Sequence, residues 1–272
     1  MSLLEMSHVT LGLTVDGIGR TLLDDVTVSV DRREIVGLVG ESGSGKSTAA
    51  RAAIGILPAG ARLSGKIAVE GTDALGGSPA ELRRLRAETV GMVFQDPRSS
   101  VNPVWPLGTF LTESLRVNLH LSREESTTRV LDALNSVGLR DPEQLLSRYP
   151  GELSGGMLQR VVIAAALAAE PHLIIADEAT SALDVTTQAD VLAVLRQAQR
   201  ERGLGMLFIT HDLHLAAAFC DRVLVMYRGR IVEEQEGAAL FEHAKHPYTR
   251  ALLAAVPGIR TPHEHPEGGA PA

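Results

Sequence analysis

Apolar and polar residues follow two different periods along this chain, and the changes between them predict its secondary structure. Residues 8–30 contain the β-rich stretches HVTLGLTV and LLDDVTVSV, which the turn-forming DGIG separates. The short apolar run EIVGLVG at 34–40 is typical of a strand buried in a parallel sheet. A glycine-rich loop follows, and then KSTAARAAIGIL at 46–57 has the pattern of a helix.

Strands and helices continue to alternate further along the chain. Strands are predicted at 65–71, 90–96, 171–179 and 205–212, and helices at 79–88, 186–203, 213–220 and 246–257. Between Asp96 and Ala169 the pattern is mainly helical, with helices at 107–119, 123–138 and 154–169. Residues 221–234 predict a hairpin around Arg228 and Gly229. Alternation interrupted by a helical block predicts a parallel α/β core with an inserted helical lobe.

Composition and charge narrow the classes of function. The chain has 272 residues and a net charge of −7, so no overall basic footprint for nucleic acid is present. Only 3% of the residues are aromatic, which disfavours stacking on nucleic-acid bases. The single cysteine, Cys220, fits a reducing compartment. The longest apolar run, at 161–169, is about half of the roughly 20 residues that a membrane span needs. We therefore expect a protein that does not cross a membrane but can lie against one.

The glycine-rich loop GESGSGKS at 40–47 matches the phosphate-binding pattern G-x-x-x-x-G-K-[ST], between a predicted strand and helix. Glycines let the backbone N–H groups turn toward phosphate oxygens, Lys46 supplies a charge to the β- and γ-phosphates, and Ser47 offers a hydroxyl to Mg²⁺. The predicted nucleotide-binding residues are Gly40, Glu41, Ser42, Gly43, Ser44, Gly45, Lys46, Ser47 and Thr48. The chain has no Asn-Lys-x-Asp element for guanine, which favours ATP.

Polar side chains end three of the other predicted strands. Asp177 and Glu178 close LIIADE; Asp177 suits a Mg²⁺ ligand through its water shell, and Glu178 suits a general base for the attacking water. Gln95 closes VGMVFQD and can contact Mg²⁺ and the water, while His211 closes LFITHD and can bind the γ-phosphate. Any one of them alone is more often a solvated strand end or a helix cap. Beside a phosphate loop, they favour ATP hydrolysis.

The stretch ELSGGMLQR at 152–160 contains two adjacent glycines at the start of a predicted helix. Ser154 suffices as the N-cap, and each glycine costs roughly 1 kcal/mol in a helix. One interpretation is a simple loop-to-helix turn. The other is that something approaches the backbone of Gly155 and Gly156 closely.

In this order, the motifs resemble those of the nucleotide-binding subunit of ABC transporters, over roughly residues 3–257. The resemblance implies a P-loop NTPase (RecA-like) fold: a parallel-sheet α/β core, an N-terminal antiparallel β subdomain, and an inserted α-helical subdomain at about 97–169. The corresponding domain would span residues 1–257, followed by a flexible tail at 258–272, whose proline, glycine and polar content is typical of disorder.

The resemblance also implies a site shared between two subunits that pair head to tail. LSGGM resembles the signature motif, so Ser154, Gly155 and Gly156 would cap the γ-phosphate bound by the partner's phosphate loop. Asp184, in SALD, would communicate across the same interface. The implied cofactors are ATP and Mg²⁺. The implied partners are a second ATPase subunit, favoured to be a sister chain, two permease subunits and a substrate-binding protein, at the cytoplasmic face of the membrane.

FQDPRSSVNP at 94–103 and HPYTRALLAAVP at 246–257 resemble the oligopeptide, dipeptide and nickel importer branch, and GILPAG at 55–60 resembles its nickel or metallophore members. Unlike many ABC subunits, the chain has no aromatic residue at 7–33 to stack on adenine, so aliphatic and charged side chains are expected there. The alternatives are a non-transport ABC ATPase acting on nucleic acid or ribosomes, and a P-loop kinase. Metal binding by HAKH at 243–246 or HEH at 263–265 is the less favoured interpretation of those histidines.

Overall fold

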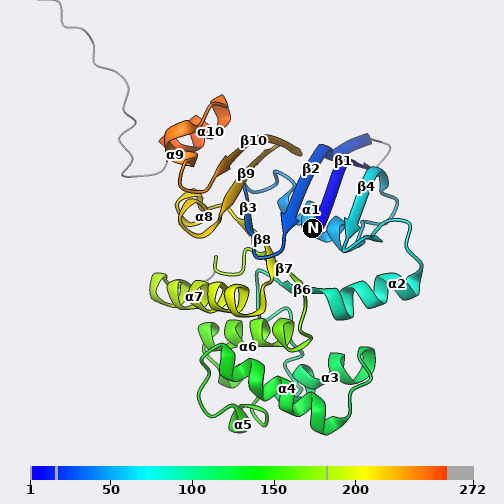
Figure 1. Cartoon of the computed structure of the whole chain (residues 1–272), viewed down its shortest axis with the longest axis vertical. Helices are drawn as coiled ribbons and strands as arrows, with labels where there is room; N and C mark the ends of the chain where they lie inside the picture. Colours follow the sequence, from blue (N-terminus) through cyan, green and yellow to red (C-terminus); the bar gives the residue numbers. More distant parts are fainter. Residues whose placement is uncertain (1, 16–17, 182, 256–272) are drawn as a thin grey trace, which may run out of the picture.

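The computed structural model describes residues 2–15, 18–181 and 183–255, which form two sheets with helices packed around them (Figure 1). The N-terminal sheet has four strands in the order β2-β1-β4-β5, and every neighbouring pair is antiparallel. Its strands are β1 (Ser2–Val15), β2 (Ile18–Asp31), β4 (Arg62–Val69) and β5 (Thr72–Asp73). This sheet is the predicted antiparallel β subdomain.

The second sheet has six strands in the order β10-β9-β3-β8-β7-β6. Its strands are β3 (Ile35–Val39), β6 (Val90–Val93), β7 (Leu173–Asp177), β8 (Gly205–Thr210), β9 (Arg222–Tyr227) and β10 (Arg230–Glu236). All neighbours are parallel except β9 and β10, which form an antiparallel hairpin. Every residue of β3, β7 and β8 is buried, as expected for central strands of a parallel sheet. The predicted parallel core is thus confirmed.

Most of the helices fall into two groups. Those packed around the sheets are α1 (Lys46–Ala53), α2 (Pro79–Arg84), α7 (Val185–Arg202), α8 (Leu213–Phe219), α9 (Leu240–His243) and α10 (Pro247–Ala254). The helical block contains α3 (Leu107–Asn118), α4 (Arg123–Ser136), α5 (Pro142–Leu145), the 3₁₀ turn η2 (Pro150–Glu152) and α6 (Gly155–Ala168). Figure 1 shows this block at the end of the molecule away from the N-terminal sheet.

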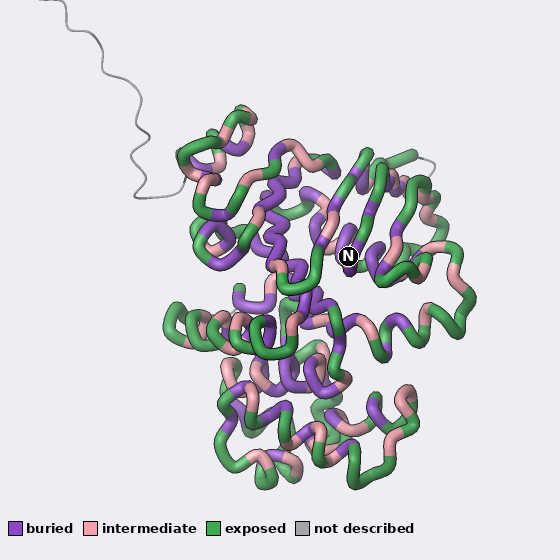
Figure 2. The backbone as a smooth tube through the Cα atoms, viewed as in Figure 1, coloured by how far each residue is buried: buried purple, intermediate pink, exposed green. Residues whose placement is uncertain are grey.

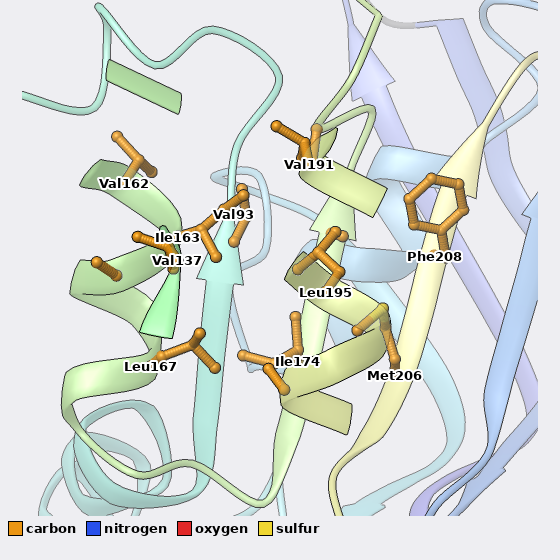
Figure 3. Packing of buried hydrophobic residues seen from close by; sticks show 14 of the residues in the cluster. Val93, Val137, Val162, Ile163, Leu167, Ile174, Val191, Leu195, Met206 and Phe208 are labelled. Carbon is orange, nitrogen blue, oxygen red and sulfur yellow. The ribbon is translucent and has the colours of Figure 1, made fainter. Parts of the chain in front are cut away.

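The core forms two clusters, on opposite faces of the parallel sheet. On one face, side chains of α6 and α7 such as Leu167 and Leu195 pack with Ile174 and Phe208 of the strands (Figure 3). On the other face, α1 and the N-terminal sheet cover the alternate residues of the same strands, including Leu38. Figure 2 shows burial concentrated along the central strands and exposure on the outer helical faces.

Some predicted boundaries are wrong. Helix α1 ends at Ala53 instead of Leu57, because Gly55 adopts φ +68° and a Cβ there would lie 2.5 Å from the carbonyl oxygen of Ala74. The helix predicted at 79–88 changes after Arg84 into a π-helical turn, η1 (Leu85–Thr89). No helix of the described residues is both long and apolar enough to span a membrane. The predicted tail at 258–272, with the HEH sequence, lies outside the described residues.

Candidate active site

The phosphate loop runs from the end of β3 to the start of α1, as predicted. Gly40, Gly43 and Gly45 have φ values of +155°, +81° and +112°, which side chains other than hydrogen rarely permit. A Cβ on Gly40 would lie 2.2 Å from the carbonyl oxygen of Met226. Helix α1 begins at Lys46, so its free N–H groups and positive end face the loop. The N–H groups of this loop and of the first turn of α1 are therefore placed to bind an anion.

Lys46 is buried inside this loop. Its Nζ donates hydrogen bonds to the carbonyl oxygens of Gly40 and Glu41, each at 2.8 Å. Burial lowers the pKa of Lys46, while the nearby carboxylates of Glu178 and Asp177 act in the opposite direction. The two carbonyl groups and the two carboxylates thus stabilise the charged form of Lys46, whose ammonium group has little access to water.

Ser47 and Asp177 lie together at the floor of the site. The Ser47 Oγ donates to Asp177 Oδ1 at 2.9 Å, joining the first turn of α1 to the end of β7. Burial raises the pKa of Asp177 above its ordinary value, and the charge of Glu178 adds to this, whereas the hydrogen bond from Ser47 opposes it. A hydroxyl and a carboxylate at this distance are hard oxygen donors, which fits the chemistry that Mg²⁺ requires.

Glu178 occupies a strained position beside Asp177. Its φ is +49°, in the left-handed region that non-glycine residues seldom adopt, and its N–H donates to the carbonyl oxygen of Ile209 at 3.0 Å. Gln95 Nε2 donates to Glu178 Oε2 at 2.9 Å, and His211 Nδ1 lies 3.4 Å from the same oxygen. Three predicted catalytic side chains, which follow β6, β7 and β8, therefore meet at one carboxylate oxygen.

One cleft of about 790 Å³ is lined by most of the phosphate loop and by Gln95, Glu178 and His211. Its lining residues are Thr21, Leu22, Ser42, Gly43, Gly45, Lys46, Ser47, Thr48, Gln95, Glu178, His211, Arg228 and Gly229. The sequence does not predict Thr21 or Leu22 as parts of the site. It predicts the turn at Arg228 and Gly229, but not that this turn lines the cleft. The turn reaches the phosphate loop because Gly229 N–H donates to the carbonyl oxygen of Ser44 at 2.8 Å. Ser181, also missed, lies 3.4 Å from the Gln95 amide.

The signature-like loop does not line this cleft. Ser154 caps α6, since its Oγ accepts from the N–H of Met157, and the loop borders a separate depression near Arg140 and Arg160. A Cβ on Gly156 would lie 2.4 Å from Thr187 Cγ2, whereas a Cβ on Gly155 would meet nothing within 4 Å. The chain's own packing thus explains Gly156 but not Gly155.

Asp184 is connected to the same loop. Its carboxylate caps α7 by accepting from the N–H of Thr187 at 3.0 Å and from the Thr187 hydroxyl at 2.7 Å. These hydrogen bonds lower the pKa of Asp184. Because Thr187 also packs on Gly156, Asp184 and the signature-like loop form one connected surface outside the cleft.

A phosphate loop between a central strand and a helix, with acidic residues at the end of a neighbouring strand, defines a P-loop nucleotide-binding protein. Residues 23–181 match the family described as ABC transporter, and the chain belongs to this family. Both the fold class and the family expected from the sequence are confirmed.

Two relatives and one solved structure illustrate the similarity. The chain is 42% identical over 244 residues to the probable D,D-dipeptide transport ATP-binding protein DdpD of Escherichia coli, covering 89% of this chain and 74% of that protein. It is 42% identical over 258 residues to the oligopeptide transport ATP-binding protein OppD of Mycobacterium tuberculosis, covering 94% of this chain but 42% of that relative's length. The dimeric ATP-binding cassette MJ0796 with ADP and Pi superposes with a TM-score of 0.76 and 28% identity, over 86% of this chain and 98% of that one.

Proposed function

We propose that this chain is the ATP-hydrolysing subunit of an ABC importer that takes up peptides through separate permease subunits. The observation that carries ATP hydrolysis is the meeting of Gln95, Glu178 and His211 at one oxygen, in the same cleft as the phosphate loop. A carboxylate there can accept a proton from a water molecule that attacks the γ-phosphorus of a triphosphate bound in the loop.

The role of each residue in this mechanism follows from the position of its side chain. Residues 43–48 bind the phosphates through backbone N–H groups, and Lys46 adds its charge. Ser47 and Asp177, with Gln95, would hold Mg²⁺, which would neutralise charge on the phosphate oxygens. Glu178 takes the proton of the attacking water. His211 contacts the γ-phosphate and, with Gln95, orients the Glu178 carboxylate.

We propose that the complete site needs a second subunit. Ser154, Gly155 and Gly156 are at the N-terminus of α6, a favourable place for an anion, and the exposed Gly155 leaves its backbone open. Within the described residues, none of these three lines the cleft that contains the chain's own phosphate loop. They would therefore cap the γ-phosphate of a partner, with Asp184 beside them. The dimeric state of MJ0796 supports this arrangement, and a sister chain is the favoured partner.

The cargo is proposed from the relatives, because it would meet the permeases and a substrate-binding protein rather than this chain. The names of DdpD and OppD favour peptides over nickel or a metallophore. The subunit would work at the cytoplasmic face of the membrane. The alternative of an ATPase acting on nucleic acid or ribosomes is disfavoured by the net charge of −7.

The proposal is tested by comparing Lys46→Ala with Lys66→Ala in equilibrium ATP binding. Lys46 is buried in the loop, whereas Lys66 is an exposed lysine on β4, so the two variants remove the same charge from different places. We expect Lys46→Ala to weaken ATP binding at least tenfold and Lys66→Ala to leave it unchanged. Equal ATP binding by both variants would contradict the proposal that ATP binds at Lys46. Co-purification with the permeases and binding protein, followed by identification of the retained ligand, tests the cargo.

A further inference from the structure

Helix α10 contacts the phosphate loop from outside the cleft. The hydroxyl of Tyr248, in the first turn of α10, accepts a hydrogen bond from the backbone N–H of Glu41 at 3.1 Å, across 207 residues of sequence. Figure 1 shows α10 beside the β9–β10 edge of the sheet. This contact takes no part in the proposed hydrolysis of ATP.

The peptide group that Tyr248 contacts is one of the two that accept a hydrogen bond from Lys46. The Glu41 N–H belongs to the peptide between Gly40 and Glu41, and the carbonyl oxygen of that same peptide accepts from Lys46 Nζ at 2.8 Å. One rigid, planar group is therefore fixed at both ends, by Tyr248 on its N–H and by Lys46 on its C=O. Without the hydroxyl, the N–H end would lose its protein partner and the peptide could rotate more freely. The position of the Lys46 ammonium would then be less well defined.

Tyr248 is itself held in place by its surroundings. The Glu233 carboxylate of β10 accepts hydrogen bonds from the N–H groups of Lys245 and His246 at 2.6 and 3.2 Å, which fixes the start of α10. The N–H of Tyr248 donates to His246 Nδ1 at 3.2 Å. The ring of Tyr248 packs on that of Tyr227, with the centroids 4.1 Å apart. Because these contacts hold the Tyr248 ring in place, its hydroxyl can orient the backbone N–H of Glu41.

The aromatic pair also connects to the cleft through the β9–β10 turn. The Arg228 guanidinium lies over the Tyr227 ring, 5.1 Å from its centroid, and Arg228 lines the cleft. Tyr227 and Arg228 border a small groove along the outer side of the phosphate loop. The loop is thus supported along its outer side by the turn and by α10.

We propose that Tyr248 is a positioning residue for nucleotide binding, which orients the Gly40–Glu41 peptide and thereby the ammonium group of Lys46. Helix α10, although it follows all the predicted catalytic motifs, then contributes to the affinity for ATP. This inference rests on the proposed role of Lys46.

The test compares two conservative variants of the full chain, Tyr248→Phe and Tyr227→Phe. Both keep the packed pair of rings, but only the first removes a hydrogen bond, since no hydrogen bond of the Tyr227 hydroxyl occurs in the described part of the chain. We expect Tyr248→Phe to raise the Kd for MgATP about five- to tenfold, the usual effect of one hydrogen bond of this kind. In turnover assays KM should rise by a similar factor with kcat within threefold of the native value. Tyr227→Phe should bind like the native chain.

The melting temperature of the nucleotide-free protein separates positioning from general stability. The inference predicts that both variants melt within a few degrees of the native chain. It is overturned if Tyr248→Phe binds MgATP with native affinity, if Tyr227→Phe weakens binding equally, or if KM is unchanged while kcat falls. If Lys46→Ala also binds ATP normally, the phosphate-loop assignment fails as well. If Lys46→Ala fails to bind and Tyr248→Phe binds normally, only this inference fails.

Discussion

The Ser47 hydroxyl donates a hydrogen bond to Asp177 Oδ1 at 2.9 Å, and so joins two motifs that lie 130 residues apart. The contact depends on topology. Strands β3 and β7 both flank β8 and run parallel to it, so the loop after β3 and the acid at the end of β7 reach the same edge of the sheet. The pair brings a hydroxyl oxygen and a carboxylate oxygen together beside the phosphate loop.

Replacing Asp177 should therefore make ATP binding insensitive to magnesium. We expect Asp177→Asn to weaken ATP binding about tenfold or more in the presence of Mg²⁺ and to change it little in EDTA, because the variant loses a charged ligand but keeps the loop. The measurement is equilibrium ATP binding under both conditions. Asp132→Asn, on an exposed part of α4, provides the control. An equal loss with and without Mg²⁺ would argue against a metal role.

The two signature glycines should respond differently to alanine. In Gly156→Ala the new Cβ would collide with Thr187 Cγ2, so α6 or α7 must shift, which costs about 1–3 kcal/mol of unfolding free energy. In Gly155→Ala the Cβ meets open space, so the stability should stay equal or rise slightly, through better helix propensity. Denaturant unfolding of both variants measures this. Equal destabilisation by both would contradict the packing described here.

Cys220 should be almost unreactive in the folded chain. The residue is 6% exposed, and burial raises the pKa of its thiol to about 12. At pH 8 a thiol with that pKa is ionised in roughly one molecule in 10,000, and the thiolate is the reactive form. We expect alkylation by iodoacetamide at pH 8 to be at least 100-fold slower in the folded than in the urea-unfolded chain. Fast labelling under native conditions would show that this region opens.

Local sequence signals are enough to place the phosphate loop between a strand and a helix, because its glycines, lysine and serine lie within eight consecutive residues. They also placed Gln95, Glu178 and His211 at strand ends, and a parallel sheet brings such ends together. The contact between Tyr248 and Glu41 leaves no local signal, since it depends on where α10 packs after the β9–β10 hairpin. The end of α1 was missed because the close approach of Gly55 to Ala74 is a tertiary contact.

Ser154 allows a test of the proposed pairing between subunits. Ser154→Arg places a bulky side chain where a partner's γ-phosphate would lie, so ATP-dependent association with the partner subunit should be lost. Ser122→Arg is the matched control, because Ser122 is also an exposed N-cap, at the start of α4. Each substitution should cost about 1 kcal/mol through loss of the cap. Sedimentation of each variant with its partner and ATP is the measurement, and normal association of Ser154→Arg would contradict a shared site.

The most direct test of the account is the rate of ATP hydrolysis by Glu178→Gln, measured together with its affinity for ATP. Glutamine keeps the size of the side chain and one oxygen that can accept from Gln95, but it cannot accept the proton of the attacking water. We predict that the variant binds MgATP within about threefold of native affinity and hydrolyses it about 100-fold or more slowly. Hydrolysis at a near-native rate would show that Glu178 is not the general base.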